Sequence, residues 1–265
     1  MTLIQIVVLA LIQGLTEFLP VSSSAHLILG SKLFSWPDQG LLFDVAVHIG
    51  TLFAVLFYFR QTIAEMCVSW LRPATSASQQ QHRTMGKLVV LASIPVILAG
   101  AIAHQWVEAY LRDVRVIAVA TLVFGVLLWV CDAIFTRDRK LADLKLKPAL
   151  LIGLAQVLAL IPGASRSGVT ITMGRMLGFS ADAAARFSFL LAIPVISAAG
   201  AYGLLRMIND DASINWAQFS MAVVFSAAAG WVCIAAFLAL LKRFGLLPFV
   251  IYRLILGLAL LILAF

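Results

Sequence analysis

Apolar runs of about twenty residues, separated by short polar stretches, make up most of this chain. A helix needs about 20 apolar residues to cross the hydrocarbon core of a bilayer. Tryptophans lie near the ends of several runs, as is typical of side chains at a membrane surface. The pattern predicts an all-α, polytopic membrane protein with six transmembrane helices, at about 41–59, 87–107, 115–135, 183–206, 217–241 and 246–264.

Two more apolar stretches are interrupted by a proline. Residues 1–19 are followed by Pro20 and then by residues 21–34, and residues 148–161 are followed by Pro162 and a further apolar stretch. Non-helical backbone at membrane depth is tolerated only where protein buries it or where it lines a cavity. We therefore expect each stretch to form a re-entrant hairpin, or a helix broken within the membrane.

The basic residues divide unevenly between the two membrane faces. The face richer in lysine and arginine is cytoplasmic by the positive-inside rule, which places both termini outside the cytoplasm. Three crossings separate the two broken stretches, so these enter from opposite faces and can meet near the midplane. This order predicts one integral membrane domain, 1–265, built from inverted-topology repeats at about 1–135 and 148–265. The cytoplasmic face carries thirteen basic residues (Arg60, Arg72, Arg83, Lys87, Arg137, Arg139, Lys140, Lys145, Lys147, Arg175, Arg186, Lys242 and Arg243), and the opposite face carries four (Lys32, Arg112, Arg115 and Arg206).

Composition supports a membrane protein and excludes other classes. The chain is 63% hydrophobic and 12% charged, whereas soluble domains are about half apolar and about a quarter charged. Loops that set topology account for the net charge of +7, and no basic cluster is interleaved with aromatics as single-strand nucleic-acid binding requires. The three cysteines and four histidines lack the spacing of a zinc site or a disulfide framework. The longest linker, 73–84, is rich in Ser and Gln and is expected to be aqueous.

The first interruption, QGLTEFLPVSSSAH at residues 13–26, groups an acid, hydroxyls and an imidazole. Gln13 and Glu17 are four residues apart and share one helix face, where their oxygens can hold a hard divalent cation or one can act as a base. Pro20 ends this helix, and Ser22 or Ser23 can cap the next, whose N-terminus attracts anions. The alternative is a proline kink with Glu17 at the interface, which leaves His26 unexplained.

The second interruption, PGASRSGVT at residues 162–170, contains a lone arginine among hydroxyls. Arg166 offers a planar set of donors suited to phosphate, and Ser165 can cap the helix that follows. Ser167 and Thr170 supply further hydroxyls. The alternative is that Arg166 pairs with Glu17 for structure alone, but buried ion pairs contribute little to stability.

Other polar residues in apolar segments are less informative. Asp44 and His48 share one face of the first full helix, where they either support the site or lie at the interface, and we favour the interface. Residues at segment ends are expected to be solvated; these are His104, Glu108, Asp132, Asp210 and Asp211.

The two interruptions resemble the two signature stretches of the undecaprenyl-diphosphatase family, the bacitracin-resistance phosphatases, and the resemblance extends over the full length. It implies a hydrolase of the bacterial inner membrane that converts undecaprenyl diphosphate to undecaprenyl phosphate and phosphate, which recycles the lipid carrier of peptidoglycan synthesis and confers bacitracin resistance. It also implies dependence on Mg²⁺ or Ca²⁺ and a site open to the outer face. By motif position the family's site residues correspond to Gln13, Glu17, Ser22, Ser23, His26, Ser165, Arg166, Ser167 and Thr170.

Roles follow from this resemblance together with the chemistry of the residues. We expect Glu17, helped by Gln13, to hold the cation or polarise the attacking group, and Arg166 to bind the diphosphate. Ser23 is favoured as nucleophile, with His26 nearby, and direct attack by His26 stays open. The family has Glu or Gln at the position of Gln13, so Glu17 is the only carboxylate in this motif. A transporter or flippase of a phosphorylated polyprenyl lipid is the competing class, and homo-oligomerisation is left open.

Overall fold

The computed structural model describes residues 1–34, 36, 39–73, 75–111, 113–135, 138–209 and 215–264, without the side chains of residues 30–33, 108 and 208. The basic residues Arg112 and Arg137 and the carboxylates at 210 and 211 lie outside the described residues, as do the side chains of Lys32 and Glu108.

Helices form nearly all of the described chain, which contains no strand, so the all-α prediction is confirmed. Among the described residues, five helices are long and apolar enough to cross a membrane, namely α3, α5, α6, α9 and α10, whereas α11 is apolar but has 17 residues. The helices are α1 (Leu3–Glu17), α2 (Ser23–Leu33), α3 (Gly40–Tyr58), α4 (Arg60–Leu71), α5 (Ala77–Tyr110), α6 (Val114–Ile134), α7 (Leu146–Ala155), α8 (Arg166–Met176), α9 (Ala181–Asn209), α10 (Trp216–Phe244) and α11 (Leu247–Leu263), with short 3₁₀ turns η1 (Leu141–Asp143) and η2 (Gln156–Leu160).

The connection between α3 and α5 is more helical than its sequence suggested. The helix α4 follows α3 almost directly, and α5 begins at Ala77 rather than near residue 87. Ser76 and Gln79 form a capping box, in which each side chain bonds the backbone N–H of the other residue. Such a box satisfies backbone donors at a helix start. The stretch 73–84, expected to be an aqueous linker, is therefore helical from Ala77 onward, and most of its described side chains are exposed.

Both proline-containing stretches are broken helices, as predicted. The first break lies between α1 and α2, and the second between η2 and α8. Ser22 and Ser165 end the breaks with positive φ angles of 74° and 68°. Each side chain then caps the next helix, since Ala25 N donates to Ser22 Oγ at 3.4 Å and Gly168 N donates to Ser165 Oγ at 3.2 Å. The predicted serine caps are confirmed.

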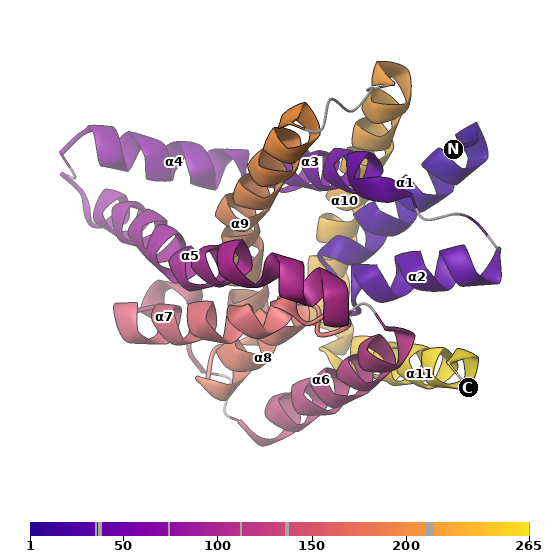
Figure 1. Ribbon diagram of the computed structural model, residues 1–265. Helices are drawn as coiled ribbons and strands as arrows, with labels where there is room; N and C mark the ends of the chain where they lie inside the picture. Colours follow the sequence, from indigo (N-terminus) through magenta and orange to yellow (C-terminus); the bar gives the residue numbers. More distant parts are fainter. Residues whose placement is uncertain are drawn as a thin grey trace.

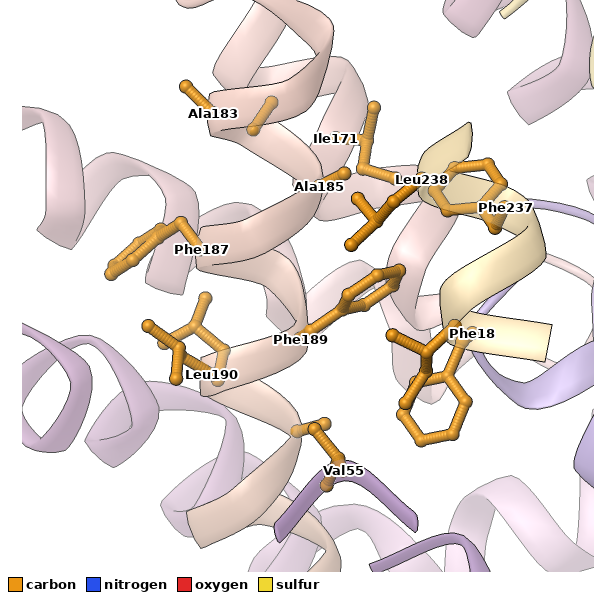
Figure 2. Packing of buried hydrophobic residues seen from close by; sticks show 14 of the residues in the cluster. Phe18, Val55, Ile171, Ala183, Ala185, Phe187, Phe189, Leu190, Phe237 and Leu238 are labelled. Carbon is orange, nitrogen blue, oxygen red and sulfur yellow. The ribbon is translucent and has the colours of Figure 1, made fainter. Parts of the chain in front are cut away.

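Two groups of helices pack around α9 (Figure 1). The helices α1, α3 and α10 lie side by side, α5 packs on α7, α6 packs on α8 and α11, and α9 contacts both α3 and α8. Phe18, in the first break, meets Phe189 of α9 edge to face at 5.5 Å between ring centroids, and Phe189 meets Phe237 of α10 at 5.7 Å (Figure 2). All three rings are fully buried, so the first break is fixed to two long helices by aromatic contacts.

Asp132 was expected to be solvated at its segment end, but it forms an ion pair with Arg175. Arg175, at the end of α8, is fully buried, and its Nε lies 2.7 Å from Asp132 Oδ1 of α6. Arg175 also donates to the carbonyl oxygen of Phe179. The helix α8 continues to Met176 and packs on α6, which removes the charge of Arg175 from water. That buried charge needs a partner, and the Asp132 carboxylate, still 18% exposed, supplies it.

We expect Gly153→Ala to destabilise the protein because α7 and α5 touch there. A Cβ atom at Gly153 would lie 2.1 Å from the carbonyl oxygen of Ala92, so the helices would have to separate. Overpacking of this kind costs about 1–3 kcal/mol. The measurement is the thermal unfolding midpoint in detergent. Gly100→Ala is the matched control, because its Cβ would meet only Leu160 Cδ2 at 3.6 Å. Equal midpoints for the two variants would contradict this packing.

Candidate functional site

The two breaks contact each other directly, as the sequence predicted. Gly163 N donates to Ser24 Oγ at 3.4 Å, and Ser167 Oγ donates to the carbonyl oxygen of Leu19 at 2.7 Å. Between them, Glu17 Oε1 lies 3.5 Å from Arg166 Nη2. An acid from one break and a guanidinium from the other therefore share one site.

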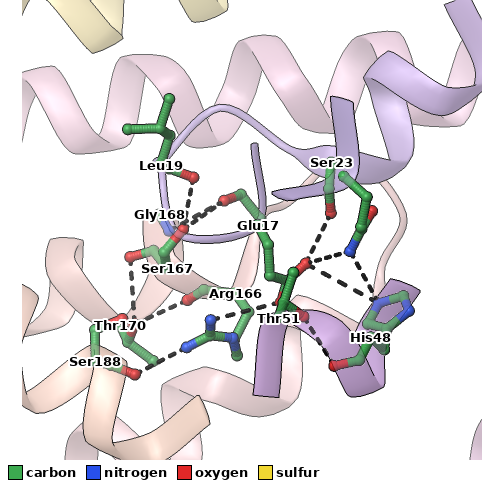
Figure 3. Close-up of polar contacts among 12 residues, drawn as sticks. Glu17, Leu19, Ser23, His48, Thr51, Arg166, Ser167, Gly168, Thr170 and Ser188 are labelled. Atoms are coloured by element: carbon green, nitrogen blue, oxygen red, sulfur yellow. Dashed lines mark hydrogen bonds and ion pairs between the residues drawn. The ribbon is translucent and has the colours of Figure 1, made fainter. Parts of the chain in front are cut away.

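The carboxylate of Glu17 gathers polar groups around one oxygen. Its Oε2 accepts hydrogen bonds from Gln13 Nε2 at 2.9 Å and from Ser23 Oγ at 3.1 Å (Figure 3). The Glu17 side chain is only 9% exposed, so these bonds act with little competition from water. A carboxylate that already accepts the hydroxyl proton of Ser23 is placed to remove it.

Arg166 leaves part of its guanidinium available for a ligand. Its Nη1 donates to the carbonyl oxygen of Ser188 at 2.8 Å, whereas Nε and Nη2 are buried and make no hydrogen bond within the described residues. Buried donors of this kind are costly unless a partner arrives. Thr170 Oγ1 lies 2.8 Å from the carbonyl oxygen of Arg166 and 2.7 Å from Ser188 Oγ, which fixes the start of α8 against α9.

A cavity of about 800 Å³ opens over these groups. One part of its lining is polar and the other is apolar, with residues from α2, α6 and η2. Such a lining suits an amphipathic molecule with an anionic head. The polar part includes Gln13, Glu17, Ser22, Ser23, Ser165 and Arg166, and the apolar part includes Leu27, Ile28, Val114, Ile117, Leu160 and Ile161.

Ser167, Thr170 and His26 do not line this cavity. Ser167 and Thr170 are almost completely buried, and their hydroxyls bond the carbonyl oxygen of Leu19 and the side chain of Ser188, respectively. The His26 ring bonds the carbonyl oxygen of Ser22 through Nδ1 and the hydroxyl of Tyr252 through Nε2, both at 2.7 Å. Of the predicted site residues, these three therefore contact the cavity wall rather than the cavity.

His48 belongs to the site, so its interpretation as an interfacial residue is wrong. Its Nε2 lies 3.3 Å from Gln13 Nε2 and 4.0 Å from Glu17 Oε2. Its Nδ1 lies 2.6 Å from the carbonyl oxygen of Asp44, one turn earlier. Because a carbonyl oxygen only accepts, Nδ1 carries a proton and Nε2 faces the site. An ionisable residue on the inner face of an apolar helix was the signal for this role.

Arg253 is the residue that reading the sequence missed. It is fully buried in α11 and donates to carbonyl oxygens of both breaks, to Pro20 at 3.2 Å and to Gly163 at 2.7 Å. It also donates to the carbonyl oxygens of Thr121, at 2.9 Å, and of Ala164. A lone arginine within an apolar segment was a sufficient signal, by the same reasoning that identified Arg166.

The oxygen atoms of Glu17 and Gln13 are suitable ligands for a hard divalent cation. Gln13 Oε1 is buried next to Glu17 and makes no hydrogen bond within the described residues. A carboxylate and an amide oxygen are ligands that Mg²⁺ and Ca²⁺ accept. The described part of the chain contains no cluster of three or more His, Cys, Asp or Glu side chains that could hold an ion, so water and phosphate oxygens would complete the coordination.

Comparisons with known proteins support the resemblance drawn from the motifs. The family model described as bacitracin resistance protein BacA matches residues 6–259. The undecaprenyl-diphosphatase of Teredinibacter turnerae is 50% identical, with 99% of each chain covered. The undecaprenyl-diphosphatase of Alcanivorax borkumensis is 51% identical, with 97% of each chain covered. Undecaprenyl-diphosphatase 1 of Pseudoalteromonas translucida is 48% identical over 99% of this chain and 98% of its own.

We expect Arg253→Met to destabilise the protein strongly. The substitution leaves the carbonyl oxygens of Pro20 and Gly163 buried without a donor, and each unsatisfied group costs about 1–3 kcal/mol. Thermal unfolding and protease susceptibility in detergent measure the loss. Arg243→Met is the control, because the Arg243 guanidinium lies over the ring of Phe244 at the exposed end of α10. Equal stability of the two variants would show that the buried guanidinium does not join the breaks.

Proposed function

The chain belongs to the bacitracin resistance protein BacA family, and we propose that it hydrolyses undecaprenyl diphosphate to undecaprenyl phosphate and inorganic phosphate. This activity recycles the lipid carrier of peptidoglycan synthesis and fits the family's role in bacitracin resistance. The observation that carries the proposal is the convergence of Glu17, Ser23 and Arg166 on one cavity with an apolar wall. The three groups suit the diphosphate, and the wall suits the first isoprenoid units.

In the proposed mechanism, Arg166 binds and orients the terminal phosphate. Its Nε makes no hydrogen bond within the described residues, and its Nη2 makes only the ion pair with Glu17 Oε1 at 3.5 Å there, so both nitrogens can donate to phosphate oxygens. Ser165 and Arg166 begin α8, so backbone N–H groups and the positive end of the helix dipole also face the anion. These fixed donors stabilise the charge that develops on the phosphoryl oxygens.

Ser23 is the proposed nucleophile and Glu17 its base. The Ser23 oxygen attacks the terminal phosphorus while its proton passes to Glu17 Oε2, 3.1 Å away. The bond between phosphorus and the bridging oxygen breaks, and undecaprenyl phosphate leaves. Glu17 passes the proton from Ser23 to the departing phosphate or to solvent and is a carboxylate again. Water then attacks the phosphoserine while Glu17 accepts a proton from that water. The bond between phosphorus and Ser23 Oγ breaks, Glu17 returns the proton to Ser23 Oγ, and phosphate is released.

Glu17 and Gln13 would hold the divalent cation that we propose as cofactor. When bound, the cation supplies Lewis-acid neutralisation of the phosphate charge. The amide of Gln13 now donates to Glu17 through Nε2, so turning the amide would present its buried Oε1 beside the carboxylate. The side chain of Gln13 thus determines whether an oxygen or a nitrogen lies beside the Glu17 carboxylate.

We also propose the finer membrane arrangement that the sequence predicted. In it α11 is the sixth crossing, α1–α2 and α7–α8 are re-entrant hairpins, and 1–135 and 148–265 are inverted repeats. Reciprocal packing supports this, because α10 packs on α1 and α3 whereas α5 packs on α7 and α9. The charge division then places the cavity and both termini on the outer side of the inner membrane.

Phosphate release from undecaprenyl diphosphate in detergent tests the function. With Mg²⁺ or Ca²⁺ present we expect the wild type to release phosphate, and Glu17→Ala and Arg166→Ala to be at least about 100-fold slower, since each removes a charge that acts on the transition state. EDTA should also abolish release. Glu65→Ala is the control, because Glu65 pairs with His82 and is 59% exposed. Binding without release by the wild type would favour a carrier instead.

Gln13→Glu tests the cation site. A second carboxylate four residues from Glu17 adds a charged oxygen ligand, so we expect the cation concentration for half-maximal phosphate release to fall about tenfold. Gln61→Glu adds the same charge at an exposed position of α4 and should leave this concentration unchanged. An unchanged or higher requirement in Gln13→Glu would show that the cation does not bind beside Glu17.

A further inference from the structure

We propose that Tyr252 is a positioning residue for this reaction, acting through His26 on the backbone of Ser22, which precedes the nucleophile. The inference rests on the proposed function. It also assigns His26 to the support of Ser23, not to attack or proton transfer. Tyr252 lies in α11, directly before Arg253, and belongs to neither motif.

The His26 ring is fully engaged by two partners. Nδ1 lies 2.7 Å from the carbonyl oxygen of Ser22, and Nε2 lies 2.7 Å from the hydroxyl of Tyr252. A carbonyl oxygen accepts only, so Nδ1 carries the proton and Nε2 accepts from the tyrosine hydroxyl. The two rings are nearly parallel, at 4° and 5.5 Å between centroids. Both nitrogens are therefore used in holding the loop, and His26 does not line the cavity.

The contact with Ser22 acts on a strained residue. Ser22 has a φ of 74°, which is uncommon for a residue other than glycine and persists where surrounding contacts enforce it. Its side chain lies 3.1 Å from Ser24 Oγ, and its carbonyl group is fixed by His26. The orientation of that carbonyl sets the direction in which the chain enters α2, and therefore where Ser23 Oγ lies relative to Glu17.

The helix α11 holds both sides of this turn. Arg253 donates to the carbonyl oxygen of Pro20, two residues before Ser22, and Tyr252 binds His26, four residues after it. Ala25 of α2 also packs with Leu256 and Leu260 of α11. Consecutive residues of one helix thus fix the strained turn from two directions.

Steady-state phosphate release by four variants separates positioning from chemistry. We expect Tyr252→Phe to lower kcat about two- to tenfold, the effect of one hydrogen bond, with KM unchanged because Arg166 is untouched. His26→Asn keeps an N–H donor in place of Nδ1 and should resemble Tyr252→Phe. His26→Ala removes the donor and should lower kcat about ten- to a hundredfold. Tyr202→Phe is the control, because Tyr202 also bonds a histidine Nε2, that of His104 at 2.6 Å, and is similarly exposed.

The double variant His26→Asn with Tyr252→Phe completes the test. We expect it to be no slower than His26→Asn alone, since Tyr252 acts through Nε2, and we expect the pH profile of His26→Asn to match that of the wild type. Loss of activity in His26→Asn equal to that in His26→Ala, or a changed pH profile, would assign chemistry to His26 and overturn the proposal. A Tyr252→Phe variant as fast as Tyr202→Phe would also overturn it.

Two controls keep the outcomes separate. Thermal unfolding in detergent shows whether each variant is folded, and a kcat loss in a variant with wild-type stability cannot come from unfolding. A wild type that releases no phosphate would refute the proposed function itself, whereas an active wild type with the wrong variant pattern refutes only the role of Tyr252 and His26.

Discussion

The arrangement of the protein depends on one buried guanidinium. A helix that breaks within an apolar layer exposes carbonyl groups that no water can satisfy, and each would cost several kcal/mol. Arg253 donates to carbonyl oxygens in both breaks and to that of Thr121 in α6. Burying the Arg253 charge without partners would also be costly. The hydrogen bonds between Arg253 and the carbonyl groups therefore offset both desolvation costs. Gly168 leaves space for it, since a Cβ there would lie 2.5 Å from Arg253 Nη1.

The chemistry follows from this meeting of two breaks. The first break follows α1, which ends at Glu17, and precedes α2, which begins at Ser23. The second break precedes α8, which begins at Arg166. Neither break alone contains a carboxylate, a nucleophilic hydroxyl and a positively charged group that can bind phosphate. Joined, they place Glu17 3.1 Å from the Ser23 hydroxyl and 3.5 Å from the Arg166 guanidinium, in the wall of a cavity that also has an apolar side. Low exposure strengthens each electrostatic contact. The buried Nε of Arg166 makes no hydrogen bond within the described residues and is available to a phosphate.

The sequence predicted the polar residues of the two breaks better than the residues elsewhere in the chain that contact them. Proline, serine and ionisable residues within apolar runs identified both breaks, their capping and their meeting, because such residues are costly in a membrane unless they are used. The same reasoning was not applied to Arg253 and was set aside for His48 and Asp132, all of which the structure pairs with buried groups. Hydrophobic periodicity shows where a helix runs, but it does not show which carbonyl group or carboxylate a distant side chain will meet. That partner is set by packing between helices far apart in the chain, such as α6, α8 and α11.

Identifying the residue that becomes phosphorylated during turnover tests most directly whether the breaks form one catalytic site around Ser23. The purified protein would be quenched after brief reaction with undecaprenyl diphosphate labelled in its terminal phosphate, and the labelled residue identified by mass spectrometry. We expect an acid-stable phosphoserine at Ser23 that is absent from Ser23→Ala, while Ser24→Ala, which changes the neighbouring hydroxyl, retains it. An acid-labile phosphohistidine at His26, or full phosphate release by Ser23→Ala, would contradict the site described here.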